Sequence, residues 1–208
     1  MPLAQILQTF KDAVAQCDSL IANAHKVDAN GTSILPVMDQ QQITTAAFLN
    51  LFIAWESFLE SSVTDFMIGT PTITGTQPVR FVSPPTLDAA NAMVIGGVMQ
   101  HFDFAKHEYV RRSVAIFFRN GYPFEPHLTS ILNDLEDLRK MRNACAHISS
   151  TTRTALESLA LRIFGQPQTG ITVYRMLTAV DPRSGNGNTV FVTYRDKLLV
   201  TAELIARG

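Results

Sequence analysis

The chain has 208 residues, 46% of them hydrophobic, and this composition excludes intrinsic disorder because enough apolar side chains are present to form a core. The formal net charge of -1 argues against a broad basic surface for non-specific nucleic-acid binding, although a local basic cleft is compatible with it. The length suits one domain. We expect residues 1–208 to form a single domain, with a core at about 38–165 and a tail at 166–208 whose structure the pattern leaves open.

The two cysteines, Cys17 and Cys145, lack the spacing of a metal site and lie on apolar helical stripes. We interpret them as reduced core thiols and expect no metal and no other cofactor. The N-terminus lacks the basic region and cleavage pattern of a signal peptide. The most apolar run, residues 46–55, is shorter than the roughly 20 residues that span a bilayer. These features predict a soluble cytoplasmic protein with no membrane partner.

Helical periodicity is clear in the first third of the chain. Apolar residues at three- and four-residue steps predict a helix over about 2–26 and a longer one over about 38–68, which Gly69 and Pro71 should end. The proline-containing segment 70–85 has little periodicity and is long for a loop in a compact domain. This segment could be a lid, a partner-binding arm or a mobile connection, and the sequence does not decide among the three.

The middle of the chain contains two further predicted helices. The first covers 87–98 and is weakened by Gly96 and Gly97. The second covers 101–118 and has His107 and Arg111 on one face, four residues apart. Such a basic cluster is usually a solvated helix face, and a phosphate contact is the alternative.

A leucine-rich helix with Pro126 in its first turn should follow, over about 126–146. The leucines recur at helical steps as far as Leu138, and the next positions that we read as in phase are Arg142 and Cys145. An unpaired buried guanidinium is strongly unfavourable. We therefore expect Arg142 to face an anion, a wet cleft or another subunit. Glu56, at the edge of the apolar stripe of the 38–68 helix, is a candidate partner.

The remaining segments complete a helical pattern. After a break at 149–152, a helix should restart and end at Gly165, with Thr154 and Glu157 as a capping box. In the tail, residues 189–194 are β-branched and aromatic enough for a strand, but the spacing of later apolar residues favours a closing helix, which we prefer. The prediction is an all-α helical bundle, with at most a small irregular or β-prone C-terminal tail.

Residues 142–147 read Arg-Asn-Ala-Cys-Ala-His, which resembles the R-x4-6-H signature of the HEPN superfamily. The Asn directly after the Arg and the Ala before the His are also similar to that family, as is the aromatic and acidic helix around Glu56. The resemblance implies a metal-independent endoribonuclease acting as a homodimer, with two motifs meeting across the interface. It further implies a toxin or phage-defence effector controlled by an antitoxin or sensor protein.

The residue types fit that chemistry. RNA cleavage through the ribose 2′-OH needs proton transfer near neutral pH, which His147 can perform, and Arg142 can stabilise the charge of the transition state. Asn143 is the third candidate catalytic residue and Glu56 a supporting one. Four further side chains are candidate RNA contacts: Arg139, Lys140, His107 and Arg111. Residues five apart on a helix point about 140° from each other. Either the helix loosens near Ala146, therefore, or a partner subunit supplies one member of each pair.

Two alternatives remain. Arg142 could form a structural ion pair with Glu56 or Asp137, with His147 as a helix cap, or the chain could be a non-catalytic HEPN-like module that binds a nucleotide or a protein partner. Family members modified by nucleotidyltransferase antitoxins carry Tyr two places after the His, where this chain has Ser149. That modification site is absent here.

Overall fold

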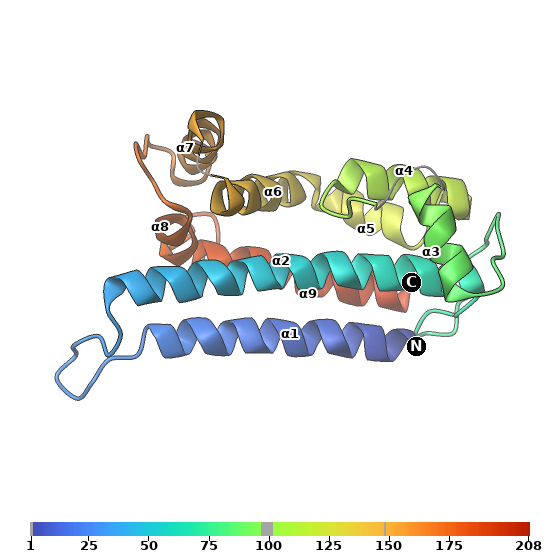
Figure 1. Ribbon diagram of the computed structural model, residues 1–208, viewed down its shortest axis with the longest axis horizontal. Helices are drawn as coiled ribbons and strands as arrows, with labels where there is room; N and C mark the ends of the chain where they lie inside the picture. The colour runs from blue at the N-terminus through green and yellow to red at the C-terminus, as the bar shows by residue number, and fades with distance from the viewer. Residues whose placement is uncertain (1, 97–101, 148) are drawn as a thin grey trace. The chain divides into compact units, whose positions relative to one another are not determined.

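The structure, a computed structural model, describes residues 2–96, 102–147 and 149–208. Within these ranges the chain forms α-helices, one short 3-10 helix and isolated β-bridges without a sheet, which confirms the predicted all-α class. In chain order, the elements are α1 (Leu3–Ala24), α2 (Val37–Ile68), α3 (Leu87–Ile95), α4 (His107–Phe117), η1 (Arg119–Gly121), α5 (Phe124–Ser130), α6 (Leu132–Ala146), α7 (Ser150–Phe164), α8 (Val173–Thr178) and α9 (Val190–Arg207) (Figure 1). Among the described helices, none is both long and apolar enough to cross a membrane.

The chain divides into two compact units, each built from segments distant in sequence. Unit 1 contains Met1–Lys11, Trp55–Leu135 and Leu198–Gly208. Unit 2 contains Asp12–Ala54 and Glu136–Lys197. The single-domain organisation stays a prediction, and each unit is described separately below.

Aromatic side chains form much of the core of unit 1. Phe66 meets Phe124 edge to face with ring centroids 5.7 Å apart, and Phe10 packs against Phe58 at 5.4 Å. The start of α1 and the end of α9 lie side by side in this unit, where Lys11 and Glu203 form an ion pair (Figure 1). The chain termini are therefore neighbours.

The proline-containing segment between α2 and α3 is tied to other parts of unit 1. The N–H of Ile73 donates to the carbonyl of Ala206 over 2.8 Å, and the Thr74 hydroxyl donates to the carbonyl of Arg207 over 2.6 Å. Arg80 donates through Nη1 to the carbonyl of Met67 over 2.8 Å. These contacts favour a structural connection over a free arm.

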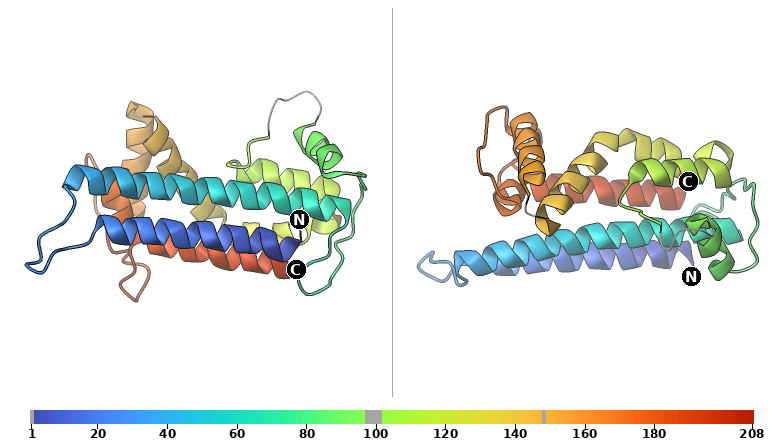
Figure 2. Two further views of the ribbon diagram at one scale, coloured as in Figure 1. Left: turned by 60° about the horizontal axis from the view of Figure 1, so that its bottom comes forward. Right: turned by 45° about the horizontal axis from the view of Figure 1, so that its top comes forward.

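Unit 2 has a buried polar contact at its centre. The hydroxyl of Tyr194 on α9 donates to Asp137 Oδ2 on α6 over 2.7 Å, and Arg162 on α7 forms an ion pair with the same carboxylate. Asp137 is 2% exposed and Tyr194 is 1% exposed. Three helices are thus joined through one carboxylate. Figure 2 gives two further views of the later segments of this unit, coloured orange to red.

The predicted helix over 101–118 begins later than expected, at His107. Residues 102–106 are not helical, because the Asp103 side chain accepts the N–H of Ala105 over 3.1 Å and forms a local turn. The predicted start at His101 and the predicted end of the preceding helix at Val98 lie outside the described residues. Within the described part, α3 ends at Ile95, followed by Gly96 in the left-handed conformation.

The predicted leucine-rich helix is two helices. It breaks at Ile131, whose ψ of 22° is non-helical, and the Ser130 hydroxyl donates to the carbonyl of His127 over 2.7 Å. A hydroxyl bonded to its own helix backbone offers a local alternative to the helical ladder. The buried face of α5 and that of α6 can therefore pack against different neighbours on either side of the break.

The predicted capping box of Thr154 and Glu157 is wrong. Helix α7 begins at Ser150, within the expected break, and its capping box consists of Ser149 and Thr152. The expected end at Gly165 is confirmed, with φ +72°. The preference for a closing helix in the tail is also confirmed, since α9 covers Val190–Arg207.

Candidate functional site

The motif lies on the last turns of α6, in unit 2. The buried face of this helix continues from Leu138 to Met141, which is fully buried, and not to Arg142 as the spacing had indicated. Arg142 therefore lies beside the buried face and is half-buried. This position keeps an arginine off the core while its aliphatic part still packs against the protein.

Asn143 holds the guanidinium of Arg142. Arg142 Nη1 donates to Asn143 Oδ1 over 3.2 Å, a contact between neighbours in sequence. The carbonyl of Asn143 accepts the N–H of His147 over 2.9 Å, a hydrogen bond at the C-terminal end of α6. One asparagine thus contacts the Arg through its side chain and the His through its backbone.

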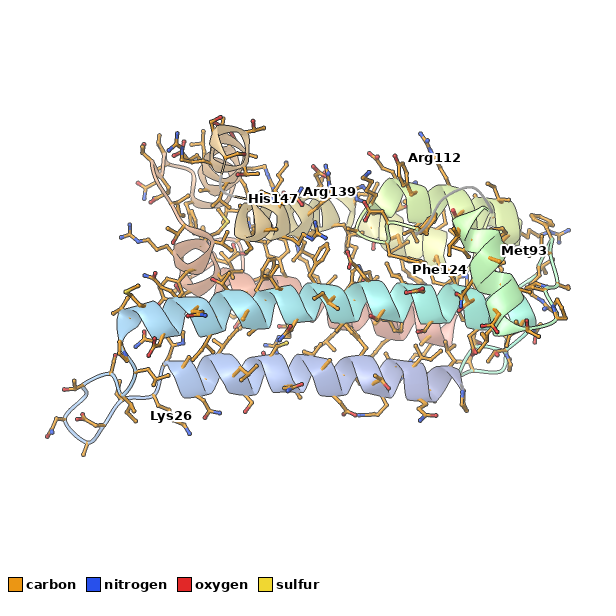
Figure 3. The ribbon with its side chains drawn as sticks, in the orientation of Figure 1. Lys26, Met93, Arg112, Phe124, Arg139 and His147 are labelled. Atoms are coloured by element: carbon orange, nitrogen blue, oxygen red, sulfur yellow. The ribbon has the colours of Figure 1, made fainter. Side chains whose placement is uncertain are left out.

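His147 lies directly after α6, with an exposed side chain. Its carbonyl accepts the hydroxyl of Thr152 over 2.7 Å, and Thr152 also forms the capping box of α7 with Ser149. The backbone of His147 is therefore held on both sides. In the part of the chain that the structure describes, its imidazole has no hydrogen-bond or ion-pair partner. Figure 3 labels His147 at the end of α6 beside α7, with Arg139 further back along the same helix.

The carboxylate proposed as a structural partner of Arg142 is used elsewhere. Asp137 binds Arg162 and Tyr194, and the ion pairs of the described residues include none between Asp137 and Arg142. Glu56, the other proposed partner, belongs to unit 1 and is engaged in an interaction within the chain. Its role beside Arg142 stays a prediction.

The other candidate RNA contacts divide between the units. On α6, Arg139 binds Glu136 through two hydrogen bonds of 2.9 Å each, and Lys140 is half-buried. His107 and Arg111 belong to unit 1, where Arg111 forms an ion pair with Glu125. The hydrogen bonds that Arg111 donates to the Glu125 carboxylate raise the pKa of Arg111. Arg139 and Arg111 thus have carboxylate partners within the chain.

A pocket of about 690 Å³ lies next to the motif, entirely within unit 2. Its walls include Ala144 and Cys145 of the motif, the first half of α2, the first turns of α7 and the segment before α8. Arg142 and His147 are not among its lining residues. Burial raises the pKa of the Cys145 thiol to about 12, so this wall is uncharged at neutral pH.

The sequence interpretation missed this pocket and the side chains of α2 that line it. Six α2 residues contribute, at spacings of three and four: Met38, Gln41, Gln42, Thr45, Ala46 and Leu49. This mixed polar and apolar stripe lies beside the stronger aromatic stripe of the same helix, which dominates the periodicity. The sequence feature that could have indicated this pocket wall is the presence of two glutamines and a threonine on one face of the helix.

Among the described residues, no group of His, Cys, Asp and Glu side chains is arranged to hold a metal ion. A scan against protein-family models finds no match to the chain, and searches of curated proteins and of solved structures find none either.

Proposed function

We propose that this chain is an endoribonuclease of the HEPN type, which cleaves RNA through attack of the ribose 2′-OH without a metal ion. The observation that carries the proposal is the state of its two ionisable motif residues. Arg142 is half-buried and bonded only to Asn143 among the described partners, and His147 is exposed at a rigidly held helix end. Both are poorly explained by a purely structural role.

One of the two ion pairs considered for the structural alternative finds no support. An arginine retained for an ion pair should contact a carboxylate, yet Asp137 binds Arg162 and Tyr194 instead, and a pairing of Arg142 with Glu56 stays a prediction. A histidine retained as a side-chain cap should bond the last carbonyls of α6. His147 occupies the capping position with its backbone N–H alone.

In the proposed reaction, His147 accepts or donates one of the two protons that move. The 2′-oxygen loses its proton and attacks phosphorus, the bond from phosphorus to the 5′-oxygen breaks, and that oxygen takes a proton. The products are a 2′,3′-cyclic phosphate and a 5′-hydroxyl. Arg142 donates to the phosphoryl oxygens as negative charge gathers there, and Asn143 positions the guanidinium.

A homodimer completes the proposed site. Arg142 precedes His147 by five residues at a helix end, and about 100° per residue sends their side chains in different directions. A second copy can place its His147 opposite Arg142 of the first. Control by an antitoxin or sensor protein, and a role as a toxin or phage-defence effector, are part of the same proposal.

The test is cleavage of a mixed RNA substrate in the presence of a chelator, with mass spectrometry of the ends. The wild type should produce 2′,3′-cyclic phosphates, and His147→Ala should lower the rate by about 10²- to 10⁴-fold, the usual contribution of a general acid or base. His127→Ala, which removes a histidine of α5, is the matched control and should retain full activity. Cleavage that persists in His147→Ala would refute the role assigned to this residue.

The second candidate function is the non-catalytic module that binds a nucleotide or a protein partner. The pocket of about 690 Å³ beside the motif favours it, since this volume lies in the range of ligand sites. Failure of the wild type to cleave any RNA in a panel of structured and single-stranded substrates would favour this function over the ribonuclease.

A further inference from the structure

The pocket beside the motif has a preformed wall on the side of α8. The hydroxyl of Tyr174 lies within hydrogen-bond distance of His25 Nε2, at 3.3 Å, and donates to Gln40 Oε1 over 3.4 Å. Its ring also stacks on His25 with centroids 6.0 Å apart. Because Tyr174 is held by His25, directly after α1, and by Gln40 of α2, the pocket does not require this side chain to move into place.

The α2 side of the pocket presents amide and hydroxyl groups. Gln41 and Gln42 are exposed on α2 and Thr45 is half-buried one turn later, with Ala46 and Leu49 as apolar neighbours. Amide side chains carry both a donor and an acceptor, the combination that reads the edges of nucleobases. The apolar neighbours offer the surface that a flat ring needs.

Arg153 supplies the charge of the pocket. It is exposed in the first turn of α7, lines the pocket and is the one charged side chain among the described lining residues. No ion pair of Arg153 is found among the described residues. The carboxylate of Glu157, one turn later, accepts the N–H of Gly170 at the pocket edge over 2.8 Å. A guanidinium beside an uncharged cavity favours an anionic ligand with an apolar or aromatic part.

We propose that this pocket binds one nucleotide, with its base against α2 and Tyr174 and its phosphate at Arg153. The inference rests on the proposed ribonuclease function for its biological meaning: the pocket shares Ala144 and Cys145 with the motif helix, so a nucleotide bound there contacts the same helix that carries Arg142. The same chemistry could come from a nucleotide within an RNA strand or from a free mononucleotide, and the experiment separates them.

Binding is measured on the full chain carrying His147→Ala, so that turnover does not interfere. Fluorescence anisotropy of a short labelled RNA gives the affinity, and adenosine monophosphate is titrated as a competitor. Arg153→Gln should weaken RNA binding about tenfold and lower the salt dependence by about one phosphate contact. Ala46→Phe, which adds a ring on an exposed pocket-lining position, should weaken it by a similar factor.

Matched controls are Arg175→Gln, an exposed cation of α8 outside this pocket, and Ala115→Phe, an exposed alanine of α4. Both should bind RNA as the parent does. Competition by adenosine monophosphate identifies a free-nucleotide site, and RNA binding without such competition identifies a substrate subsite. Either result supports the proposal if it depends on Arg153 and Ala46.

Two outcomes overturn the proposal: unchanged binding in both pocket variants, or no binding of RNA and of adenosine monophosphate. The proposed function fails separately. A wild type that binds RNA through this pocket but cleaves none leaves the nucleotide site standing and removes the ribonuclease. If the wild type cleaves RNA, and both pocket variants also cleave it at full rate and bind it as tightly, the ribonuclease stands and the nucleotide site is removed.

Discussion

Tyr194 and Asp137 are sealed from water inside unit 2, and their hydrogen bond joins α9 to α6. A buried carboxylate is costly unless its acceptor sites are filled. Asp137 has two partners, the Tyr194 hydroxyl and the Arg162 guanidinium. The motif begins five residues later on the same helix, so this carboxylate also sets how α6 is rotated where Arg142 emerges.

Tyr194→Phe should therefore lower the free energy of unfolding by about 2 kcal/mol, because the change removes one of the two donors to a buried charged group and leaves Arg162 as the remaining one. Urea denaturation measures this loss. Tyr109→Phe is the control: Tyr109 on α4 is 38% exposed, and its change should cost less than about 0.5 kcal/mol. Equal losses of unfolding free energy in the two variants would show that the buried Tyr194 hydroxyl stabilises the fold no more than an exposed one.

The two thiols predict how stability responds to alkali. Burial raises the pKa of Cys145 to about 12 and, with a smaller contribution from Asp18, that of Cys17 to about 11, from an ordinary value of 9.0. Between the ordinary and the raised pKa, the unfolded chain has lost a proton that the folded chain retains. The free energy of unfolding therefore falls as pH rises through this window, and the contribution is intact below pH 9.

Cys145→Ala should make this decline shallower, since one of the two titrations is removed. Urea denaturation of wild type and variant at several values between about pH 8 and pH 11 provides the comparison. The quantity to compare is the difference in unfolding free energy between wild type and Cys145→Ala at each pH, because lysines and tyrosines titrate equally in both proteins. Parallel curves would mean that the Cys145 thiol ionises as easily in the folded chain as in the unfolded one.

At the scale of elements, the junction of α6 and α7 supports His147. Ser149 caps α7 by accepting the N–H of Thr152 over 3.2 Å, and the Ser149 N–H donates to Thr152 Oγ1 over 3.0 Å. The hydroxyl of Thr152 in turn reaches the carbonyl of His147. One capping box therefore orders α7 and the residue that ends the motif.

Ser149→Ala should cost about 1 kcal/mol of unfolding free energy, the usual value of an N-cap hydroxyl. Ser150→Ala, at the next position, is the matched control because Ser150 is already helical and is not the cap. Chemical denaturation of both variants checks the difference. A loss no larger for Ser149 than for Ser150 would contradict the capping role.

At the scale of the whole molecule, the proposed site requires two copies of the chain. The strongest check mixes two inactive variants, Arg142→Ala and His147→Ala. In a mixed dimer, one composite site carries both substitutions and the other carries neither. Random exchange makes half of the dimers mixed, so about one quarter of wild-type activity should return.

Either variant assayed alone is the control and should stay inactive. Light scattering at micromolar concentration reports the assembly directly. A strict monomer, or mixtures that remain as inactive as their components, would remove the two-copy site while leaving cleavage by a single chain to be tested separately.

Much of this architecture follows from local chemistry. The bounds of α1 and α2 were predicted within a few residues because the apolar spacing persists over many turns, where one helix face must be buried throughout. Gly165 ends α7 as expected, since the left-handed conformation at a helix end suits a residue without a side chain. The tail was harder, because short segments satisfy strand and helix patterns alike, and packing settled it as α8 and α9.

Contacts between distant residues decided the rest. Asp137 and Tyr194 are 57 positions apart, and no spacing rule indicates that Arg162, and not Arg142, binds that carboxylate. The break at Ile131 and the pocket between α2, α6 and α7 likewise depend on which faces meet after folding. The motif itself can be recognised from the amino-acid sequence alone. The exposure of its imidazole and the cavity beside it arise only when three helices pack together, because burial is a property of neighbours and not of order along the chain.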